Sequence, residues 1–261
     1  RELFNSLPKV VAVLNGIPLY DPRKDTSVGG SGAHRWATPS TWESTRNPMV
    51  MIYAILRGIA VPGGGTWGLG VAAEDLPLSN WFAAMNACDV VVDGAPAYQA
   101  RIEISFGDEP ADVIEELLKV CSGQLAEIGG IWKASAGAPG LPVYYFSDDD
   151  MIISEGNTFT PFGSLSQTFN GVQGTYPDPD ALWQSKDAPP RHDAALEATD
   201  QGRVLTASLT FSACPYPAQV QRLMLAYLND ERRFRRHSLA LPPDAAILEP
   251  LDVVSWSSAV N

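Results

Sequence analysis

The stretch that most constrains the fold is "DEPADVIEELLKVCSG", residues 108–123. Its apolar residues recur at spacings of three and four, which predicts a helix with one buried face. These residues are Val113, Ile114, Leu117, Leu118 and Cys121. We expect Asp108 to cap this helix, Pro110 to occupy its first turn and Gly123 to supply the left-handed residue after its end. A helix this short needs a core to pack against.

A hairpin is predicted directly after this helix, in "QLAEIGGIWKAS" (residues 124–135). Two runs with strand character, Gln124–Ile128 and Ile131–Ser135, flank the pair Gly129-Gly130, which suits a two-residue turn. The 22 glycines and 21 prolines of the 261-residue chain also indicate many turns. A helical bundle is therefore disfavoured.

The remaining elements continue this mixture, so the predicted class is α+β, dominated by strands with inserted helices. One helix is expected to begin at the cap Asn47, with Pro48 in its first position, and to end at Gly58; another spans Leu78–Cys88. Further predictions are a long loop at Ala181–Gln201, a strand at Val204–Phe211, a helix within residues 216–238 and a strand at His237–Leu241.

The stretch "NGIPLYDPRKD" (residues 15–25) breaks an apolar run, as a catalytic loop, a binding loop or a structural corner would. Asn15-Gly16 predicts a hairpin turn between residues 9–14 and 17–20. Asp21-Pro22 then starts a turn, because proline fixes its own φ and the Asp carboxylate accepts hydrogen bonds from nearby backbone N–H groups. The local chemistry favours a corner.

Composition excludes several classes of protein. A formal net charge of −12 repels phosphate backbones and disfavours tight nucleic-acid binding. Cys88, Cys121 and Cys214 form no CxxC pair, so we expect small buried hydrophobes rather than a disulfide framework or a zinc site. No apolar run approaches the roughly 20 residues of a membrane span. Because the first residue is Arg1, we expect a segment of a longer protein or a processed product.

No catalytic set stands out. Asp148, Asp149 and Asp150 form an acidic cluster, but its spacing does not fit a calcium loop, and a solvated turn is the simpler interpretation. Neither a pair of carboxylates for glycosidic chemistry nor a cysteine–histidine pair is singled out. The glycine-rich stretches lack the spacing of a phosphate loop. We therefore predict no enzyme activity, no cofactor and no metal.

One basic run interrupts the acidic chain: Arg232, Arg233, Phe234, Arg235 and Arg236. We expect it in the last turn of a helix, where cations offset the negative end of the helix dipole. Arginine and aromatic residues are also enriched at the centres of protein interfaces. We interpret the run as a helix end that contacts a partner, with phosphate binding as the less favoured alternative.

Taken in order, these motifs resemble a known family. "YDPR" (Tyr20–Arg23) precedes a Trp-bearing loop and "RNPMVMIYAIL"; the helix and hairpin with "GIW" follow, then "FSDDDMI", then a strand–helix–strand unit around "AQVQRLMLAYLNDERR". This order is similar to that of the tail-tip proteins of long-tailed bacteriophages. That group includes the host-specificity protein J of lambdoid phages and related tail proteins of gene transfer agents.

The resemblance implies a strand-dominated α+β tail-hub module with tube-like β-barrel domains and inserted helices. It divides the chain into a barrel-like domain with a helical insertion (1–105), a small helix–hairpin insert (106–146) and a second barrel-like domain (147–261). It also implies a homotrimer in the virion, beneath the tail tube and in contact with tail-tube and distal-tail proteins. DNA would pass through its channel without specific binding.

On this resemblance Tyr20–Arg23 is a structural corner, and Arg23 is an ion-pairing or interface residue. The run Arg232–Arg236 is the other candidate interface segment. Two other functions stay open. One is a cell-wall-degrading enzyme of the same particle. The other is a carbohydrate-binding receptor module that uses Trp36, Trp42 and Trp67 as a stacking platform.

Overall fold

The structure is a computed structural model that describes residues 14–161, 163 and 168–258. In this part of the chain the α-helices are α1 (Pro48–Arg57), α2 (Leu78–Asp89), α3 (Pro110–Lys119), α4 (Ala194–Thr199) and α5 (Pro217–Glu231). The mixture of helices and strands agrees with the predicted class.

The strands are short and form small sheets. Antiparallel pairs join β1 (Pro18–Leu19) to β2 (Glu43–Ser44), β3 (Ile59–Ala60) to β4 (Thr66–Trp67), β5 (Val91–Val92) to β6 (Ala95–Pro96), β7 (Gln124–Ile128) to β8 (Ile131–Ser135) and β10 (Thr158–Thr160) to β14 (Arg236–Ser238). A parallel pair joins β9 (Tyr144–Ser147) to β15 (Val254–Ser257). One three-stranded sheet has the order β12 (Gln184–His192), β11 (Gly171–Asp178), β13 (Thr206–Thr210). None of these sheets closes into a barrel within the described residues, so the tube-like barrels and the three-part domain division stay predictions.

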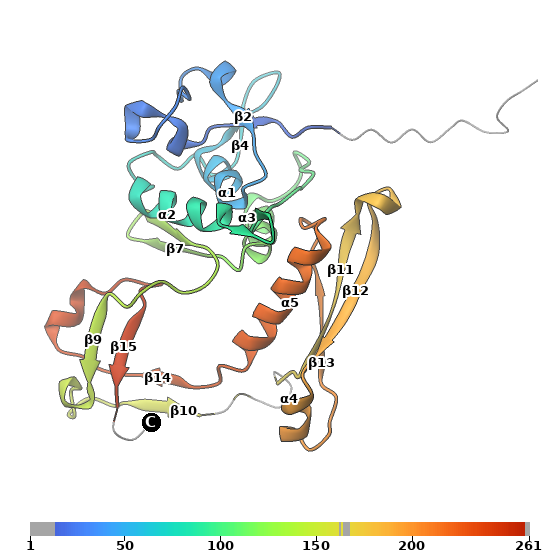
Figure 1. Cartoon of the computed structure of the whole chain (residues 1–261). Coiled ribbons are helices and arrows are strands. Elements are labelled where there is room, and N and C mark those ends of the chain that lie inside the picture. Colours follow the sequence, from blue (N-terminus) through green and yellow to red (C-terminus); the bar gives the residue numbers. More distant parts are fainter. Residues whose placement is uncertain (1–13, 162, 164–167, 259–261) are drawn as a thin grey trace, which may run out of the picture.

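Figure 1 shows α1, α2 and α3 gathered with β2, β4 and β7, while α5 lies along the sheet of β11, β12 and β13. The strands β9, β10, β14 and β15 lie together away from α1 and α2. The helices α1, α2 and α3 with their strands form an N-terminal core. The helix α5 backs the three-stranded sheet.

The helix α1 is the centre of the N-terminal core. Its cap is the predicted one: Oδ1 of Asn47 accepts hydrogen bonds from the N–H groups of Met49 and Val50, at 3.0 and 3.2 Å. Pro48 holds the first position, and Gly58, with φ of 92°, ends the helix. All residues from Pro48 to Leu56 except Met51 are buried, as expected for a helix that is apolar on every side.

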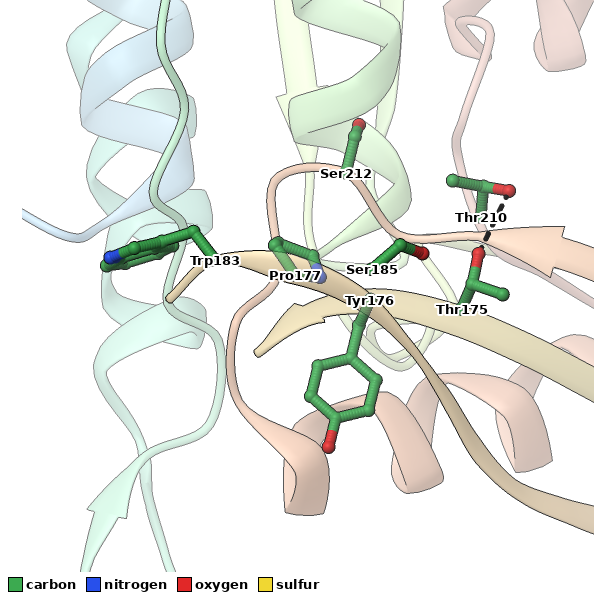
Figure 2. A pocket seen from close by; sticks show the side chains of 7 residues that line it. All are labelled: Thr175, Tyr176, Pro177, Trp183, Ser185, Thr210 and Ser212. Atoms are coloured by element: carbon green, nitrogen blue, oxygen red, sulfur yellow. Dashed lines mark hydrogen bonds between the residues drawn. The ribbon is translucent and has the colours of Figure 1, made fainter. Parts of the chain in front are cut away.

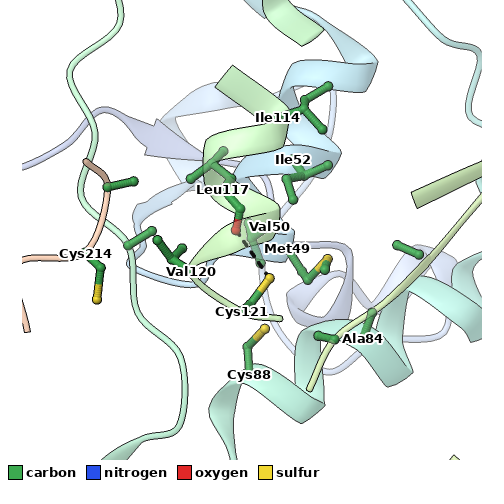
Figure 3. Close-up of a cluster of buried hydrophobic side chains, with 14 of the residues drawn as sticks. Met49, Val50, Ile52, Ala84, Cys88, Ile114, Leu117, Val120, Cys121 and Cys214 are labelled. Carbon is green, nitrogen blue, oxygen red and sulfur yellow. Dashed lines mark hydrogen bonds between the residues drawn. The ribbon is translucent and has the colours of Figure 1, made fainter. Parts of the chain in front are cut away.

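The helix α3 packs against α1 through its predicted face (Figure 3), with Val113, Ile114 and Leu117 buried. Its cap differs from the prediction, because Glu109 is the N-cap residue and the Asp108 carboxylate instead accepts a hydrogen bond from the Ser105 N–H at 2.8 Å.

The end of α3 also differs from the prediction, because the left-handed residue is Ser122, with φ of 45°, and not Gly123. Gly123 instead lies in a closely packed place, since a Cβ there would lie 2.7 Å from Cε of Met49. The hairpin β7–β8 that follows has its predicted bounds, and Gly129 and Gly130 take positive φ values of 59° and 92°.

The three-stranded sheet buries one face against α5. Val172 and Tyr176 of β11 are buried with Val220 and Leu228 of α5 in the same core. The opposite face of β11 is polar, and Gln173 bonds to Ser208 of β13 at 2.6 Å. The predicted strand Val204–Phe211 contains β13, in which buried Ala207 and half-buried Leu209 alternate with exposed residues.

Gln219 of α5 connects this C-terminal part to the N-terminal core. Its side chain is buried, with 2% exposure. Oε1 accepts from the Gln99 N–H at 2.9 Å, while Nε2 donates to the carbonyl groups of Gln99 and Val120 at 3.0 and 2.8 Å. Arg222, one turn later, donates to the Ala97 carbonyl at 2.7 Å. The amide thus pairs with backbone from two N-terminal segments at once.

The predicted long loop at Ala181–Gln201 is wrong, since this region forms β12 and α4. β12 is an edge strand whose residues are mostly exposed, so it lacks an alternating apolar pattern. Pro189 and Pro190 lie where the register with β11 shifts between Val172 and Gly174, because proline has no N–H to donate to the ladder.

The helix α5 ends at Glu231, earlier than predicted, and Arg232 is its C-cap residue. The basic run therefore lies mostly beyond the helix, and Arg236 begins β14. Near the other end of the chain, β1 pairs with β2. The first arm of the predicted Asn15-Gly16 hairpin falls largely on residues 9–13, which lie outside the described residues.

Leu117→Asp should destabilise the protein by at least about 3 kcal/mol, because it places a charge on the buried face of α3 and removes a fully buried leucine. Glu115→Ala on the exposed face of the same helix is the matched control and should change stability by less than about 0.5 kcal/mol. Urea unfolding measures both. Equal stability of Leu117→Asp and the parent would contradict the burial of this face.

Gln219→Leu should lower the free energy of unfolding by about 2–4 kcal/mol, because three backbone groups lose a buried partner. Gln221→Leu, on the same helix but with exposed partners, should cost less than about 1 kcal/mol. Chemical denaturation compares the two variants. If Gln221→Leu lowered the free energy of unfolding as much as Gln219→Leu, the loss would come from the composition of the helix and not from the Gln219 contacts.

Candidate functional site

The Tyr20–Arg23 corner is a compact hydrogen-bonded turn. Asp21 caps a 3₁₀ turn at Pro22–Lys24, with its Oδ1 accepting from the Arg23 N–H at 3.0 Å. The Arg23 guanidinium lies between the carboxylates of Asp21 and Asp89, each at 2.8 Å. Because Asp89 ends α2, these ion pairs fasten the corner to that helix. An interface role for Arg23 stays a prediction.

Asp25 stabilises the loop that follows the corner. Its carboxylate is 2% exposed and accepts hydrogen bonds from the Tyr20 hydroxyl at 2.7 Å and the Ser27 N–H at 2.8 Å, beside the Arg35 guanidinium at 3.0 Å. Burial works to raise the pKa of Asp25, but the hydrogen bonds from Ser27 and Tyr20 and the charge of Arg35 outweigh it and hold this pKa at about 2. Burial, together with Asp25, raises the pKa of Tyr20. The loop is therefore built around an ionised carboxylate.

His34 lies buried beneath this loop. Its Nδ1 accepts a hydrogen bond from the Asp21 N–H at 3.2 Å, which places the proton of the neutral ring on Nε2. Nε2 is buried without a hydrogen-bond partner among the described residues. The ring supports the corner backbone and does not reach solvent, so it is poorly placed to act as a general base.

Of the three tryptophans proposed as a stacking platform, Trp36 and Trp42 come together and Trp67 does not join them. Trp36 and Trp42 lie 5.6 Å apart between ring centroids, and the Arg57 guanidinium sits over the Trp36 ring at 4.4 Å. Trp67 belongs to β4 and donates to the Asp108 carbonyl at 3.2 Å, apart from the other two. Trp36 and Trp42 thus contact one another and Arg57 within the chain, while Trp36 stays 39% exposed.

The basic run divides into inward and outward residues. The Arg232 guanidinium, with a side-chain exposure of 13%, makes a bidentate ion pair with Asp200 and donates to the Phe169 carbonyl at 2.6 Å. Phe234 lies half-buried, 5.7 Å from that guanidinium. Arg233, Arg235 and Arg236 are exposed, and Arg233 pairs with Asp230 at 3.3 Å. Arg232 therefore holds the fold together, while the other three arginines face solvent.

The acidic cluster is a capped turn. The Ser147 N–H and hydroxyl donate to Asp150 at 2.7 and 2.9 Å, and Nε1 of Trp256 donates to Asp148 at 2.9 Å. The two hydrogen bonds from Ser147 lower the pKa of Asp150. Across the part of the chain that the structure describes, no group of three or more histidine, cysteine or acidic side chains is arranged to hold a metal ion.

Two of the three buried cysteines come together, which the sequence did not reveal. Figure 3 shows the sulfurs of Cys88 and Cys121 facing one another, whereas Cys214 lies apart. Cys88 and Cys121 lie far apart in the sequence. Their contact depends on how α2 packs beside the end of α3, which the sequence alone does not show.

A shallow hollow of about 230 Å³ lies at the three-stranded sheet, lined by Thr175, Tyr176, Pro177, Trp183, Ser185, Thr210 and Ser212 (Figure 2). These residues include hydroxyl groups but no acid, histidine or basic side chain. The Ser212 hydroxyl donates to the Glu116 carboxylate, but no histidine lines the hollow to complete a nucleophilic triad. Among the described residues no helix is long and apolar enough to cross a membrane.

Asp25→Asn should remove part of the acid sensitivity of the fold. The folded pKa of Asp25, about 2, lies below its ordinary value of 3.8, so its carboxylate stabilises the fold above pH 3.8 and loses that contribution as pH falls toward 2. The variant should be less stable at pH 7, and its stability should fall less over this pH interval. Denaturant titrations at each pH measure this, with the exposed Asp187→Asn as control. Parallel pH curves for the parent and Asp25→Asn would refute the assignment.

Comparison with known proteins adds the family. A family model described as "Putative phage tail protein" matches residues 109–261. A chain of the virion of a native gene transfer agent particle is 16% identical, with a TM-score of 0.55 over 88% of this chain and 53% of that chain. The 43 kDa tail protein of prophage MuSo2 from Shewanella oneidensis is 14% identical, with a TM-score of 0.37 over 64% of this chain and 47% of that one. No curated protein matches.

The present chain spans about half the length of the solved chains it resembles. The family match starts at the cap of α3 and continues through the hairpin β7–β8, the three-stranded sheet and α5. The likeness to the gene transfer agent chain extends a shared fold over most of the remaining residues. This chain therefore belongs to the family of putative phage tail proteins.

Proposed function

We propose that this protein is a structural subunit of a phage-like tail tip, a hub beneath the tail tube that gives DNA passage and a platform for host attachment. Its family and its fold, shared with a chain of a gene transfer agent virion, support a place in such a particle. The observation that carries the proposal is a set of strands that lack neighbours.

The parallel pair β9–β15 is incomplete by the standards of parallel sheets. Such sheets are normally buried on both faces and contain more strands, yet this pair has two strands and no further partner among the described residues. Val143 and Tyr145 beside and within β9 are 60% and 70% exposed, and Val254 of β15 is 41% exposed. A neighbouring copy of this chain, placed by cyclic symmetry, would complete this sheet and cover these side chains.

A homotrimer is the assembly we propose, in contact with tail-tube and distal-tail proteins inside the virion. The tube-like barrels would then form when open sheets of adjacent subunits meet. An overall charge of −12 suits a channel for DNA, because an acidic wall does not hold a polyanion. DNA would pass without specific binding.

A catalytic role is not favoured by the chemistry of the described residues. Asp21, Asp25 and Asp200 are occupied by arginine or hydroxyl partners within the chain. The hollow beside the sheet is lined by uncharged side chains. The contacts of Trp36 and Trp42 likewise support a structural role over glycan binding.

The outward arginines of the basic run are the proposed partner contacts. Arg235 and Arg236 are exposed, and Arg236 borders the strand pair β10–β14. Among the described residues neither makes an ion pair, in contrast to Arg23 and Arg232. An acidic surface on an adjacent subunit or tail protein would complement them.

Charge reversal by Arg235→Glu and Arg236→Glu should prevent incorporation into tails while leaving the isolated protein folded. The matched control, Arg235→Lys with Arg236→Lys, keeps the charges and should assemble. Both are introduced into the complete gene of a particle-producing strain, with tail incorporation measured by immunoblot of purified particles and folding by thermal melting. Normal incorporation of the reversed variant would refute this contact surface.

A further inference from the structure

Cys88 and Cys121 bring two thiols together inside the N-terminal core. Cys88 lies in the last turn of α2, and Cys121 follows α3. Both are fully buried in the same hydrophobic core. In Figure 3 their sulfurs point into the same small space from different segments of the chain.

The surrounding packing holds Cys121 in this position. Its thiol donates to the Leu117 carbonyl at 3.3 Å. At Gly123 a Cβ would lie 2.8 Å from the Cys121 sulfur, so the backbone closes that side of the thiol. The sulfur therefore has little freedom to turn away from Cys88, and the geometry presents the pair for bond formation.

We propose that Cys88 and Cys121 are an oxidative modification site, at which a hydroperoxide oxidant joins the two thiols in a disulfide between α2 and the end of α3. Hydrogen peroxide first converts one thiol to a sulfenic acid and releases one water. The second sulfur then attacks the sulfenic sulfur and releases a second water as the S–S bond forms. Two thiols and one peroxide thus give one disulfide and two waters, with the sulfurs oxidised and the peroxide oxygens reduced.

The environment makes this reaction slow in the folded protein. The neighbouring Cys88 thiol and burial both raise the pKa of the Cys121 thiol, which keeps the reactive thiolate scarce. The pair should stay reduced in a thiol-rich cytoplasm and oxidise over time outside it. This biological setting rests on the proposed function, because a tail subunit leaves the cell with its particle.

Cys214 offers a matched control. It is buried like the pair, and burial raises the pKa of its thiol to about 12. However, Figure 3 places it away from Cys88 and Cys121. Its sulfur lies 3.9 Å from the Tyr216 carbonyl. Cys214→Ala should therefore leave the proposed cross-link intact.

The test treats the purified reduced protein with hydrogen peroxide at pH 7 and pH 9 and then blocks the remaining thiols. Trypsin digestion and mass spectrometry follow. A disulfide should link the tryptic peptides 58–101 and 120–133, form faster at pH 9 and disappear on treatment with dithiothreitol. The link should persist in Cys214→Ala and be lost in Cys88→Ala. The oxidised protein should melt at a higher temperature than the reduced one, because the cross-link restricts the unfolded chain.

Several results would overturn the proposal. One is the absence of the linked peptide in the parent after methionines have been oxidised. Others are a disulfide that includes Cys214, or links only between different molecules. If Cys88→Ala does not fold, the peptide map of the parent and of Cys214→Ala still decides the question. Because the test uses the isolated protein, its failure leaves the proposed tail function standing, and failed tail incorporation leaves the disulfide standing.

Discussion

The buried amide of Gln219 is the contact on which the arrangement of the two halves depends. Glutamine is costly to bury, and here the cost is offset because both ends of the amide pair with backbone groups. Backbone pairing requires defined distances and directions, whereas apolar contacts between α5 and the core permit sliding. The amide thus fixes where α5, and with it the three-stranded sheet, sits relative to α1 and α3. Neither half needs a continuous sheet across the boundary.

Charge in this chain serves mainly to fasten segments. Arg23 connects the corner to α2, Arg35 supports the loop around Asp25, and Arg232 connects α5 to Asp200 at the end of α4. Each pair contains at least one side chain that is no more than 17% exposed, so removing its partner leaves that charge poorly solvated. Function is therefore to be sought in surfaces that the fold does not use, such as the exposed strand pairs and the outward arginines.

Local signals carried the correct predictions, and tertiary contacts explain the errors. Asn47-Pro48 and Gly129-Gly130 decide helix α1 and the hairpin β7–β8 through their own backbone chemistry. By contrast, β12 is a strand because β11 lies beside it, although its polar and proline-rich sequence reads as a loop. That error also hid Asp200, the partner of Arg232, so the sequence could not distinguish the inward arginine from the outward ones. The contact of Cys88 with Cys121 also depends on tertiary packing, so the sequence did not predict it.

The two adjacent prolines of β12 give the three-stranded sheet a direction of growth. Successive residues of a strand direct their N–H groups to opposite edges, so Pro189 and Pro190 remove one donor from each side of β12. The free edge of β12 is therefore a poor template, while β13 contains neither proline nor charge from Thr206 to Thr210. A sheet extendable along one border can receive a strand, yet cannot pass the addition onward through the other. Repeated strand addition is thus blocked at the β12 border, which protects the protein from polymerising into a fibre through this sheet.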